Sequence, residues 1–208
     1  MEIQKIIKDI STERFEPYLL KYNGDIQKAF NLYEFNVRIS QTFYAPLSAL
    51  EVTLRNRIDQ SFKSHFNEVY WLKTVLPNQM IKQVNEIEQK LIQSKKNPTS
   101  SRKLAELNFG FWTILFNRNL AKTFWKPLHI IFENIPKQER KRAEISSKLN
   151  QIRTFRNRIY HYEPIIWDLE VLNQKHDLIF EVLYWINPNT YQWVKTFDSY
   201  DYVIKQLK

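Results

Sequence analysis

Apolar residues recur every three or four positions along most of the chain, which is the spacing of a helix that buries one face. The clearest case follows Pro46, where the apolar residues of one face are Leu47, Leu50, Leu54, Ile58 and Phe62. The best loop between such segments is residues 95–101. The pattern therefore predicts an all-α protein.

Capping residues divide this pattern into separate helices. Ser11 is placed to cap a helix that Asn23-Gly24 would stop, and Asp25 is placed to cap the next one. Pro46 should break or kink that second helix near Ala45. The later expected helices are one that contains residues 81–96, one through 104–116, a long basic helix from beyond Pro136 to near His161, one from Asp168 through Trp185, and a short tail after 187–189.

Length and composition agree with one folded domain. The chain has 208 residues, enough to bury a core, and its content of 43% hydrophobic and 25% charged residues is typical of a folded protein. The loop at 95–101 is too short to separate two domains. We expect a single all-α domain over residues 1–208, with segments 1–24 and 187–208 as helical appendages.

The scarce residue types exclude several kinds of site. With only two glycines, Gly24 and Gly110, the sequence contains no Walker-type or dinucleotide-binding loop. With no cysteine it has no disulfide, no thiol nucleophile and no Cys-ligated metal. No apolar run has the length of a signal peptide or a membrane span. We therefore expect a cytoplasmic protein without a membrane partner.

The four residues RNRI occur twice, in VTLRNRIDQSF around Arg55 and in RTFRNRIYHYEP around Arg156. In the first copy, Glu51 and Asp59 each lie four residues from Arg55, so the three charges would line one helix face. This spacing predicts a structural role for the first copy, with Arg55 held between two carboxylates.

The second copy has a different polar face. Opposite the core side, helical spacing gathers the polar residues Asn150, Arg153, Asn157 and His161, with Arg156 and Tyr160 between them and the core edge. No carboxylate lies four residues from Arg156 or His161. We expect an arc without acidic partners, which suits a phosphodiester because guanidinium groups bind phosphate oxygens and imidazole transfers protons near neutral pH. The alternative is a basic, solvated face with one surface histidine.

The segment FRNRIYHYEPI resembles the Arg-x4-His signature of HEPN domains, with Arg156, Asn157 and His161 at the matching places. Three further stretches resemble the Abi-like (abortive infection) branch of that superfamily, in order between about Asn36 and Ile165: YAPLSALEVTLRNRI, LNFGFWTILF and HYEPI. The resemblance implies a HEPN-like helical bundle with additional N-terminal and C-terminal helices. It also implies that the first RNRI is a structural element and the second is the catalytic candidate.

The resemblance further implies a metal-independent endoribonuclease that serves as a bacterial toxin or abortive-infection effector. Its site would be composite, formed where two chains of a homodimer meet, with no cofactor and no metal. The expected catalytic residues are Arg156 on the phosphate, His161 as general acid–base, and Asn157 to orient the imidazole or contact the phosphate. A partner in trans, either a protein antitoxin or a small RNA, would restrain it.

One position departs from the pattern. In HEPN toxins with small nucleotidyltransferase antitoxins, the residue two positions after the histidine is a tyrosine that becomes modified, and here it is Glu163. Control by tyrosine modification is therefore not expected. Whether Glu163 tunes His161 or is structural stays open, as does any assistance from Tyr160 or Tyr162.

The net charge of +9 is consistent with an anionic partner but does not require one. The candidate RNA contacts are Lys141, Arg142, Lys148, Arg153, Arg158 and Tyr160. A solvated basic face is the plain alternative. The aromatic residues between Phe109 and Trp125 are expected in the core rather than stacked on bases, and the other three histidines are expected as core or surface residues.

Two other functions remain open at this point. One is a non-catalytic HEPN-like module that binds RNA or a protein, which needs neither Arg156 nor His161. The other is a helical adaptor in which the basic face is incidental.

Overall fold

The computed structural model describes residues 2–207, and all regular secondary structure in that range is helical, which confirms the all-α class. The helices, in chain order, are α1 (Ile3–Ile10), α2 (Thr12–Lys21), α3 (Ile26–Thr42), α4 (Tyr44–Phe66), α5 (Trp71–Thr74), α6 (Asn78–Gln93), α7 (Ser100–Glu106), α8 (Phe109–Ile114), α9 (Ala121–His129), α10 (Arg142–Tyr160), α11 (Leu169–Ile186), α12 (Pro188–Lys195) and α13 (Tyr200–Ile204). Short 3-10 turns lie at Arg118–Leu120, Lys137–Glu139 and Lys205–Leu207.

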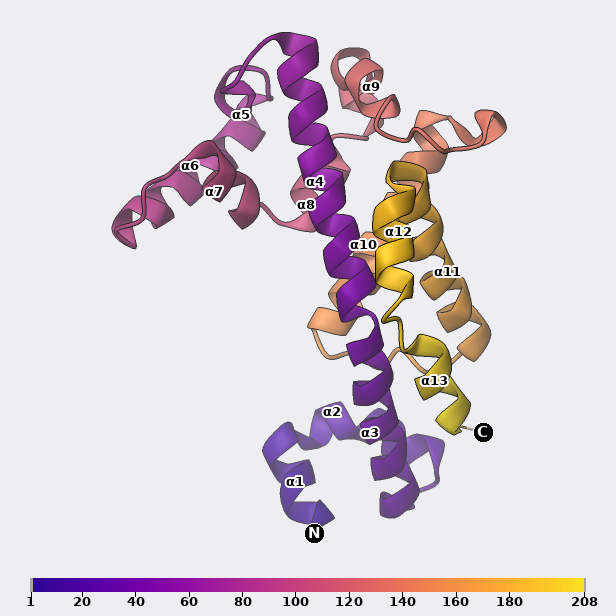
Figure 1. Cartoon of the computed structure of the whole chain (residues 1–208). Coiled ribbons are helices and arrows are strands. Elements are labelled where there is room, and N and C mark those ends of the chain that lie inside the picture. Colours follow the sequence, from indigo (N-terminus) through magenta and orange to yellow (C-terminus); the bar gives the residue numbers. More distant parts are fainter. Residues whose placement is uncertain (1, 208) are drawn as a thin grey trace.

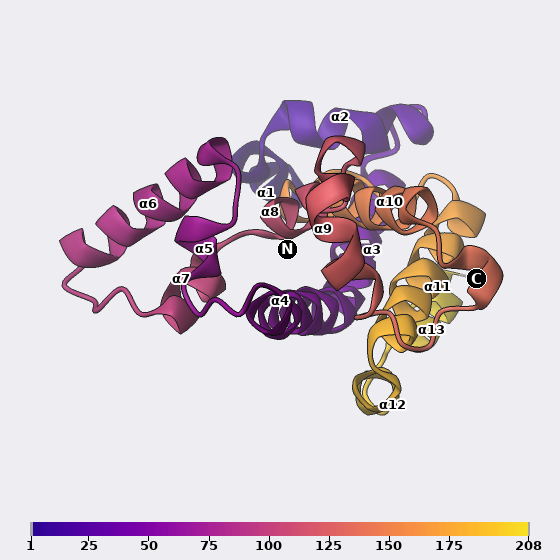
Figure 2. The ribbon, with the colours of Figure 1, turned by 90° about the horizontal axis from the view of Figure 1, so that it is seen from above.

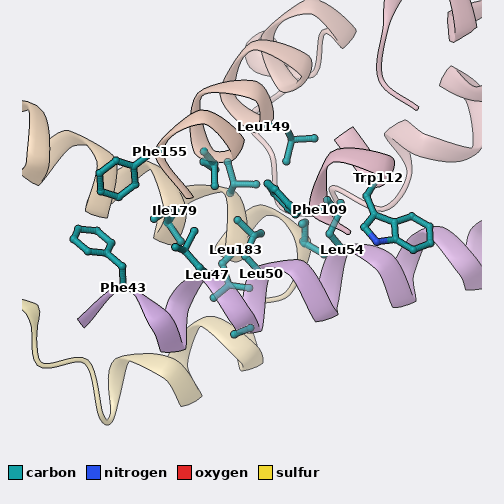
Figure 3. Close-up of a cluster of buried hydrophobic side chains, with 14 of the residues drawn as sticks. Phe43, Leu47, Leu50, Leu54, Phe109, Trp112, Leu149, Phe155, Ile179 and Leu183 are labelled. Atoms are coloured by element: carbon teal, nitrogen blue, oxygen red, sulfur yellow. The ribbon is translucent and has the colours of Figure 1, made fainter. Parts of the chain in front are cut away.

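Helix α4 is the central element. It runs through the middle of the molecule, with α6 and α7 on one side and α11 and α12 on the other (Figures 1 and 2). Its expected apolar face, from Leu47 to Phe62, is buried against α11, α9 and α12. Helix α10, which carries the second RNRI, packs against α8, α9 and α11. Figure 3 shows side chains of α4, α8, α10 and α11 meeting in one core.

Most of the expected caps are present. The side chains of Asp25 and Asp168 accept backbone N–H hydrogen bonds at the starts of α3 and α11, and Asn187, expected only in a turn, caps α12 in the same way. Ser11 precedes α2 as expected, but its hydroxyl does not cap the helix and instead donates to Glu13. Its φ of 85° lies in the left-handed region.

Two helix boundaries differ from the sequence-based expectation. The break before α4 lies at Phe43 rather than Ala45, so Pro46 falls in the first turn of α4, where a missing N–H costs no helix hydrogen bond. The helix expected through 104–116 is two helices, because Asn108 caps α8 by accepting from the N–H of Phe111 at 3.0 Å. Gly110 then lies so close to this cap that an added Cβ would be 3.0 Å from Oδ1 of Asn108.

Both segments expected as appendages contribute to the main core over the described residues. Helix α2 buries Phe15 and Tyr18, and the C-terminal helices bury Val194 and Tyr200. Tyr18 also lies against Trp167, with ring centroids 5.2 Å apart, so the N-terminal helices contact the segment that follows α10. Among residues 2–207, no helix combines the length and the apolarity that crossing a membrane requires.

Candidate active site at the end of helix α10

The C-terminus of α10 places His161 at the helix cap. The N–H of Tyr162 donates to the carbonyl of Ile159 at 3.0 Å, and the N–H of Glu163 donates to that of Arg158 at 2.9 Å. This pair of bonds is the Schellman arrangement, in which the residue after the cap is left-handed and is usually glycine. Here that residue is Tyr162, with φ of 59°. A non-glycine residue in this region costs on the order of 1 kcal/mol.

The chain after this cap is fixed by α3. The side-chain oxygen of the buried Asn36 accepts a hydrogen bond from the N–H of Ile165 at 2.8 Å. The imidazole of His161 and the amide of Asn157 are both exposed, and neither has a hydrogen-bond partner among residues 2–207. His161 is therefore held at a defined position by its backbone while its ring stays accessible.

Arg156 points inward, toward α4. Its Nη2 lies 3.5 Å from Oε2 of Glu51, and its guanidinium carbon lies 4.2 Å from the centre of the Tyr160 ring. The side chain is 25% exposed. Its Nε is buried without a hydrogen-bond partner. A carboxylate and an aromatic ring thus orient this guanidinium, while several of its donors remain unused.

The expectation of an arc without acidic partners is wrong for Arg156. The acidic partner, Glu51, is 105 residues away in sequence and comes from a different helix, so no local spacing could reveal it. Burial raises the pKa of Glu51, and the charges of Arg156 and Arg55 together with hydrogen bonds from Arg156 and the Phe109 backbone only partly oppose this. The pair is therefore a partly desolvated carboxylate beside a loosely bound guanidinium.

The expected charge row of the first RNRI copy is also wrong in its pairing. Asp59 accepts hydrogen bonds from Lys63 at 2.7 Å and from the Trp71 indole at 2.9 Å, and it forms no ion pair with Arg55. Arg55 donates only a long bond of 3.5 Å to the Ala105 carbonyl, and its Nε is buried without a partner.

The two RNRI copies meet instead at one carboxylate. Arg156 reaches Glu51 from α10, and Arg55 lies one turn after Glu51 on α4 without an ion pair to it; the charge of each arginine lowers the pKa of Glu51. Glu51 is the site residue that the sequence-based selection missed. The available signal was its position four residues before the arginine of the first copy.

The residues predicted to contact RNA differ in how far the fold already uses their side chains. Lys148 lies among three carboxylates: its Nζ is 2.8 Å from Glu181 and 3.9 Å from both Glu139 and Glu144. Arg142 donates to the carbonyl of Phe116 at 2.8 Å. These two side chains serve contacts within the fold.

The remaining candidates lie closer to the helix end or at the helix start. Arg158 pairs with Glu163 at 3.3 Å and also donates to the Pro164 carbonyl, so Glu163 has a contact within the fold. Arg153 is half-buried beside Gly110, and Lys141 is exposed before α10. RNA contact by any of these residues stays a prediction.

The other aromatic and histidine residues behave mostly as core. The expected core aromatics are buried: Phe109, Phe111, Trp112, Phe116 and Phe124, whereas Trp125 is half-buried. His176 is buried, with Nε2 2.9 Å from Oδ2 of Asp198. Within the described part of the chain, no three His, Cys, Asp or Glu side chains come together as a metal site would require.

Comparison with known proteins does not show a family. No family model matches the sequence, and neither a curated protein nor a solved structure matches it significantly. The function is therefore argued from the residues and the geometry of this chain.

Proposed function

We propose that this protein is a metal-independent endoribonuclease in which Arg156 binds the scissile phosphate and His161 transfers protons. The observation that supports it most is the state of Arg156: the guanidinium is oriented by Glu51 and Tyr160, is partly open to solvent, and has a buried Nε without an acceptor. Such a donor calls for an explanation, and beside an open guanidinium a bound anion is one. A guanidinium preset in this way suits a phosphate, whose oxygens accept two parallel hydrogen bonds.

The chemistry requires little from the protein, because RNA carries its own nucleophile. The 2′-hydroxyl gives up its proton and forms a bond to the adjacent phosphorus, and the bond from phosphorus to the 5′-oxygen breaks. The leaving 5′-oxygen takes a proton, so the products are a 2′,3′-cyclic phosphate and a 5′-hydroxyl. An accessible imidazole performs such transfers, and a fixed positive charge stabilises the extra negative charge of the phosphorane.

A homodimer would complete this site. One imidazole cannot remove the 2′-proton and protonate the leaving oxygen at the same moment, and no second histidine lies near His161 in sequence. A two-fold interface brings a surface against its own copy. The exposed end of α10 would then present His161 and Arg156 of both chains to one phosphate.

The biological setting that we propose is a bacterial, cytoplasmic toxin or abortive-infection effector of the HEPN superfamily, Abi-like branch. The ordered motifs between about Asn36 and Ile165 support this assignment. An enzyme that cuts cellular RNA needs restraint, which we assign to a protein antitoxin or a small RNA bound in trans.

The deciding experiment is incubation of purified protein with total RNA in EDTA. We expect cleavage by the natural chain and by His65→Ala, a control that removes an exposed histidine on α4. We expect no cleavage by His161→Ala, although it should bind RNA. If the natural chain binds RNA without cutting it, the protein is a non-catalytic RNA-binding module instead.

The dimeric site has its own test. Activity per chain should fall on dilution below the dissociation constant of the dimer. Mixing His161→Ala with Arg156→Ala chains should restore little activity, because each mixed dimer still lacks one group of each kind. A chain that stays monomeric at micromolar concentration and cleaves at full rate would contradict the composite site.

A further inference from the structure

A groove of about 560 Å³ lies between α3, the start of α4 and the last turn of α10. Four tyrosines line it, namely Tyr33, Tyr44, Tyr160 and Tyr162, together with smaller polar groups such as Asn36 and Ser40. No charged residue of the described chain lines it. Its size is that of a small-molecule site, and four of its nine lining residues are aromatic.

Two of these rings are unusually open to solvent. Tyr44 is 65% exposed and Tyr162 is 71% exposed. The Tyr160 phenol is neutral at physiological pH, and burial raises its pKa further. A neutral wall with open aromatic faces suits a flat, uncharged ring, since base–aromatic stacking does not depend on sequence.

The backbone at Tyr162 gives independent support. Tyr162 occupies the left-handed position of the α10 terminus, where the fold favours glycine. Strain of this kind is typical of functional sites, where the side chain is used for something other than folding. The residue that bears the strain is also the most exposed tyrosine of the groove.

Positive charge lies at the edge of the groove rather than inside it. The guanidinium of Arg156 stacks on Tyr160 at 4.2 Å, and that of Arg14 lies 5.4 Å from the centre of the Tyr162 ring. Aromatic faces beside arginines match a nucleotide, in which an uncharged base is attached to a charged phosphate.

We infer that this groove binds an unpaired nucleobase of single-stranded RNA, next to the phosphate that Arg156 holds. The inference rests on the proposed RNA substrate and adds a preference for single strands, because a base paired and stacked in a duplex has no free face for the tyrosine rings. The competing occupant is a second copy of this chain, which would cover the same rings.

The test uses 2′-O-methyl octa-adenylate, which has no free 2′-hydroxyl and cannot be cleaved. An abasic octamer with the same number of phosphates is the matched ligand. Fluorescence anisotropy with the full-length protein should show at least about tenfold tighter binding of the octa-adenylate, since stacking of even one or two bases contributes that much.

Substitutions of the tyrosines distinguish an effect of the ring on binding from an effect on stability. Tyr162→Gly should keep or raise the melting temperature, because glycine suits the left-handed position, and should weaken octa-adenylate binding about fivefold or more. Tyr162→Phe should retain binding, and Tyr44→Ala should weaken it. The control is Tyr202→Ala, which removes an equally exposed ring, 71%, on α13.

Several results would overturn the inference. Equal binding of the two octamers by the natural chain would do so, as would unchanged octa-adenylate binding in both Tyr162→Gly and Tyr44→Ala. If the tyrosine variants sediment differently from the natural chain but bind octa-adenylate as tightly, the groove is an interface between copies of this chain.

The same measurements keep this inference apart from the proposed function. If RNA cleavage proves independent of His161 while the tyrosine variants still lose octa-adenylate, the groove stands and the catalytic assignment falls. If cleavage depends on His161 and the octamers bind alike, only the groove falls.

Discussion

Glu51 on α4 and Asp198 just before α13 are two carboxylates that the fold satisfies to different degrees. Asp198 lies 2.9 Å from Nε2 of His176 and 3.4 Å from Nζ of Lys195, and it accepts the N–H of Tyr200 at 3.2 Å. Glu51 has the 3.5 Å approach of Arg156 and a hydrogen bond from the Phe109 backbone.

The pKa values of the two carboxyls shift in opposite directions. Burial would raise the pKa of Asp198, but the hydrogen bond and charge of His176, the Tyr200 N–H and Lys195 together hold it below its usual range. The corresponding groups around Glu51 are too weak to overcome its burial, so its pKa is raised.

The difference teaches which pair serves the fold. The ring of His176 stacks on Tyr200 at 4.1 Å, and the side chains of His176 and Asp198 are both buried. Around Glu51, both Arg55 and Arg156 keep a buried Nε without an acceptor. A well-satisfied buried pair stabilises structure, whereas donors that the fold leaves unsatisfied are available to a ligand.

The largest expected effect is on catalysis at the Glu51–Arg156 pair, which we call the open pair. Arg156→Lys keeps a positive charge beside Glu51, so the melting temperature should change little. It loses the planar fork that binds two phosphate oxygens, and RNA cleavage should fall about a hundredfold. Initial rates on a labelled RNA, with circular dichroism as the folding control, would measure this. An unchanged rate would remove Arg156 from the site.

A change at the Asp198–His176 pair, which we call the closed pair, should alter stability instead. Asp198→Asn is expected to lower the free energy of unfolding by about 2 kcal/mol at pH 7, because hydrogen bonds to a buried charge are lost. Cleavage per folded molecule should not change.

The pH dependence of this effect has a definite sign. A lowered folded pKa means that the contribution of Asp198 is fully present above the unfolded value of 3.8 and is lost as pH falls through the folded value. Urea unfolding should show that the free energy of unfolding falls less between pH 7 and about pH 3 for Asp198→Asn than for the natural chain. Equal losses would mean that Asp198 is not held in its charged form.

Those features of the fold that depend on local spacing could be predicted from the sequence. The apolar face of α4 and the caps at Asp25 and Asp168 follow from residues within one or two turns. The placement of Arg156 and His161 on one helix end also follows from their spacing.

The pairings could not be predicted, because a helical period does not say which faces meet. Asp59 lies four residues from both Arg55 and Lys63, and the sequence does not say which it prefers. The choice of Lys63 follows from Trp71, which arrives from α5 to fix the other oxygen. Arg55 therefore has no ion pair with Asp59, and it acts on Glu51 only through its charge.

Glu51→Gln tests whether the open pair positions Arg156 or stabilises the fold. The raised pKa means that ionised Glu51 is less favourable in the fold than in the unfolded chain. The glutamine variant should therefore keep or gain stability at pH 7, while cleavage falls about tenfold because Arg156 is less well oriented. A large loss of stability with full activity would make the pair structural.

The sign of the Glu51 effect is opposite to that of Asp198. The contribution of Glu51 is present below the unfolded value of 4.5 and is lost as pH rises through the folded value. Urea unfolding should therefore show that the free energy of unfolding declines more from pH 4 to pH 7 for the natural chain than for Glu51→Gln.

The smallest expected effect is at Arg55. Because its one hydrogen bond within the described chain is 3.5 Å long and it forms no ion pair there, Arg55→Gln should change the free energy of unfolding by less than about 1 kcal/mol. Removing its charge should nevertheless raise the pKa of Glu51 further, which a carbon-detected NMR titration of the glutamate carboxyls would measure. Asp59→Asn is the matched comparison on the same helix, and it should cost more because the Trp71 and Lys63 contacts are closer. If Arg55→Gln is instead the more destabilising of the two, Arg55 stabilises the fold, and Arg156 is the only arginine near Glu51 with a functional role.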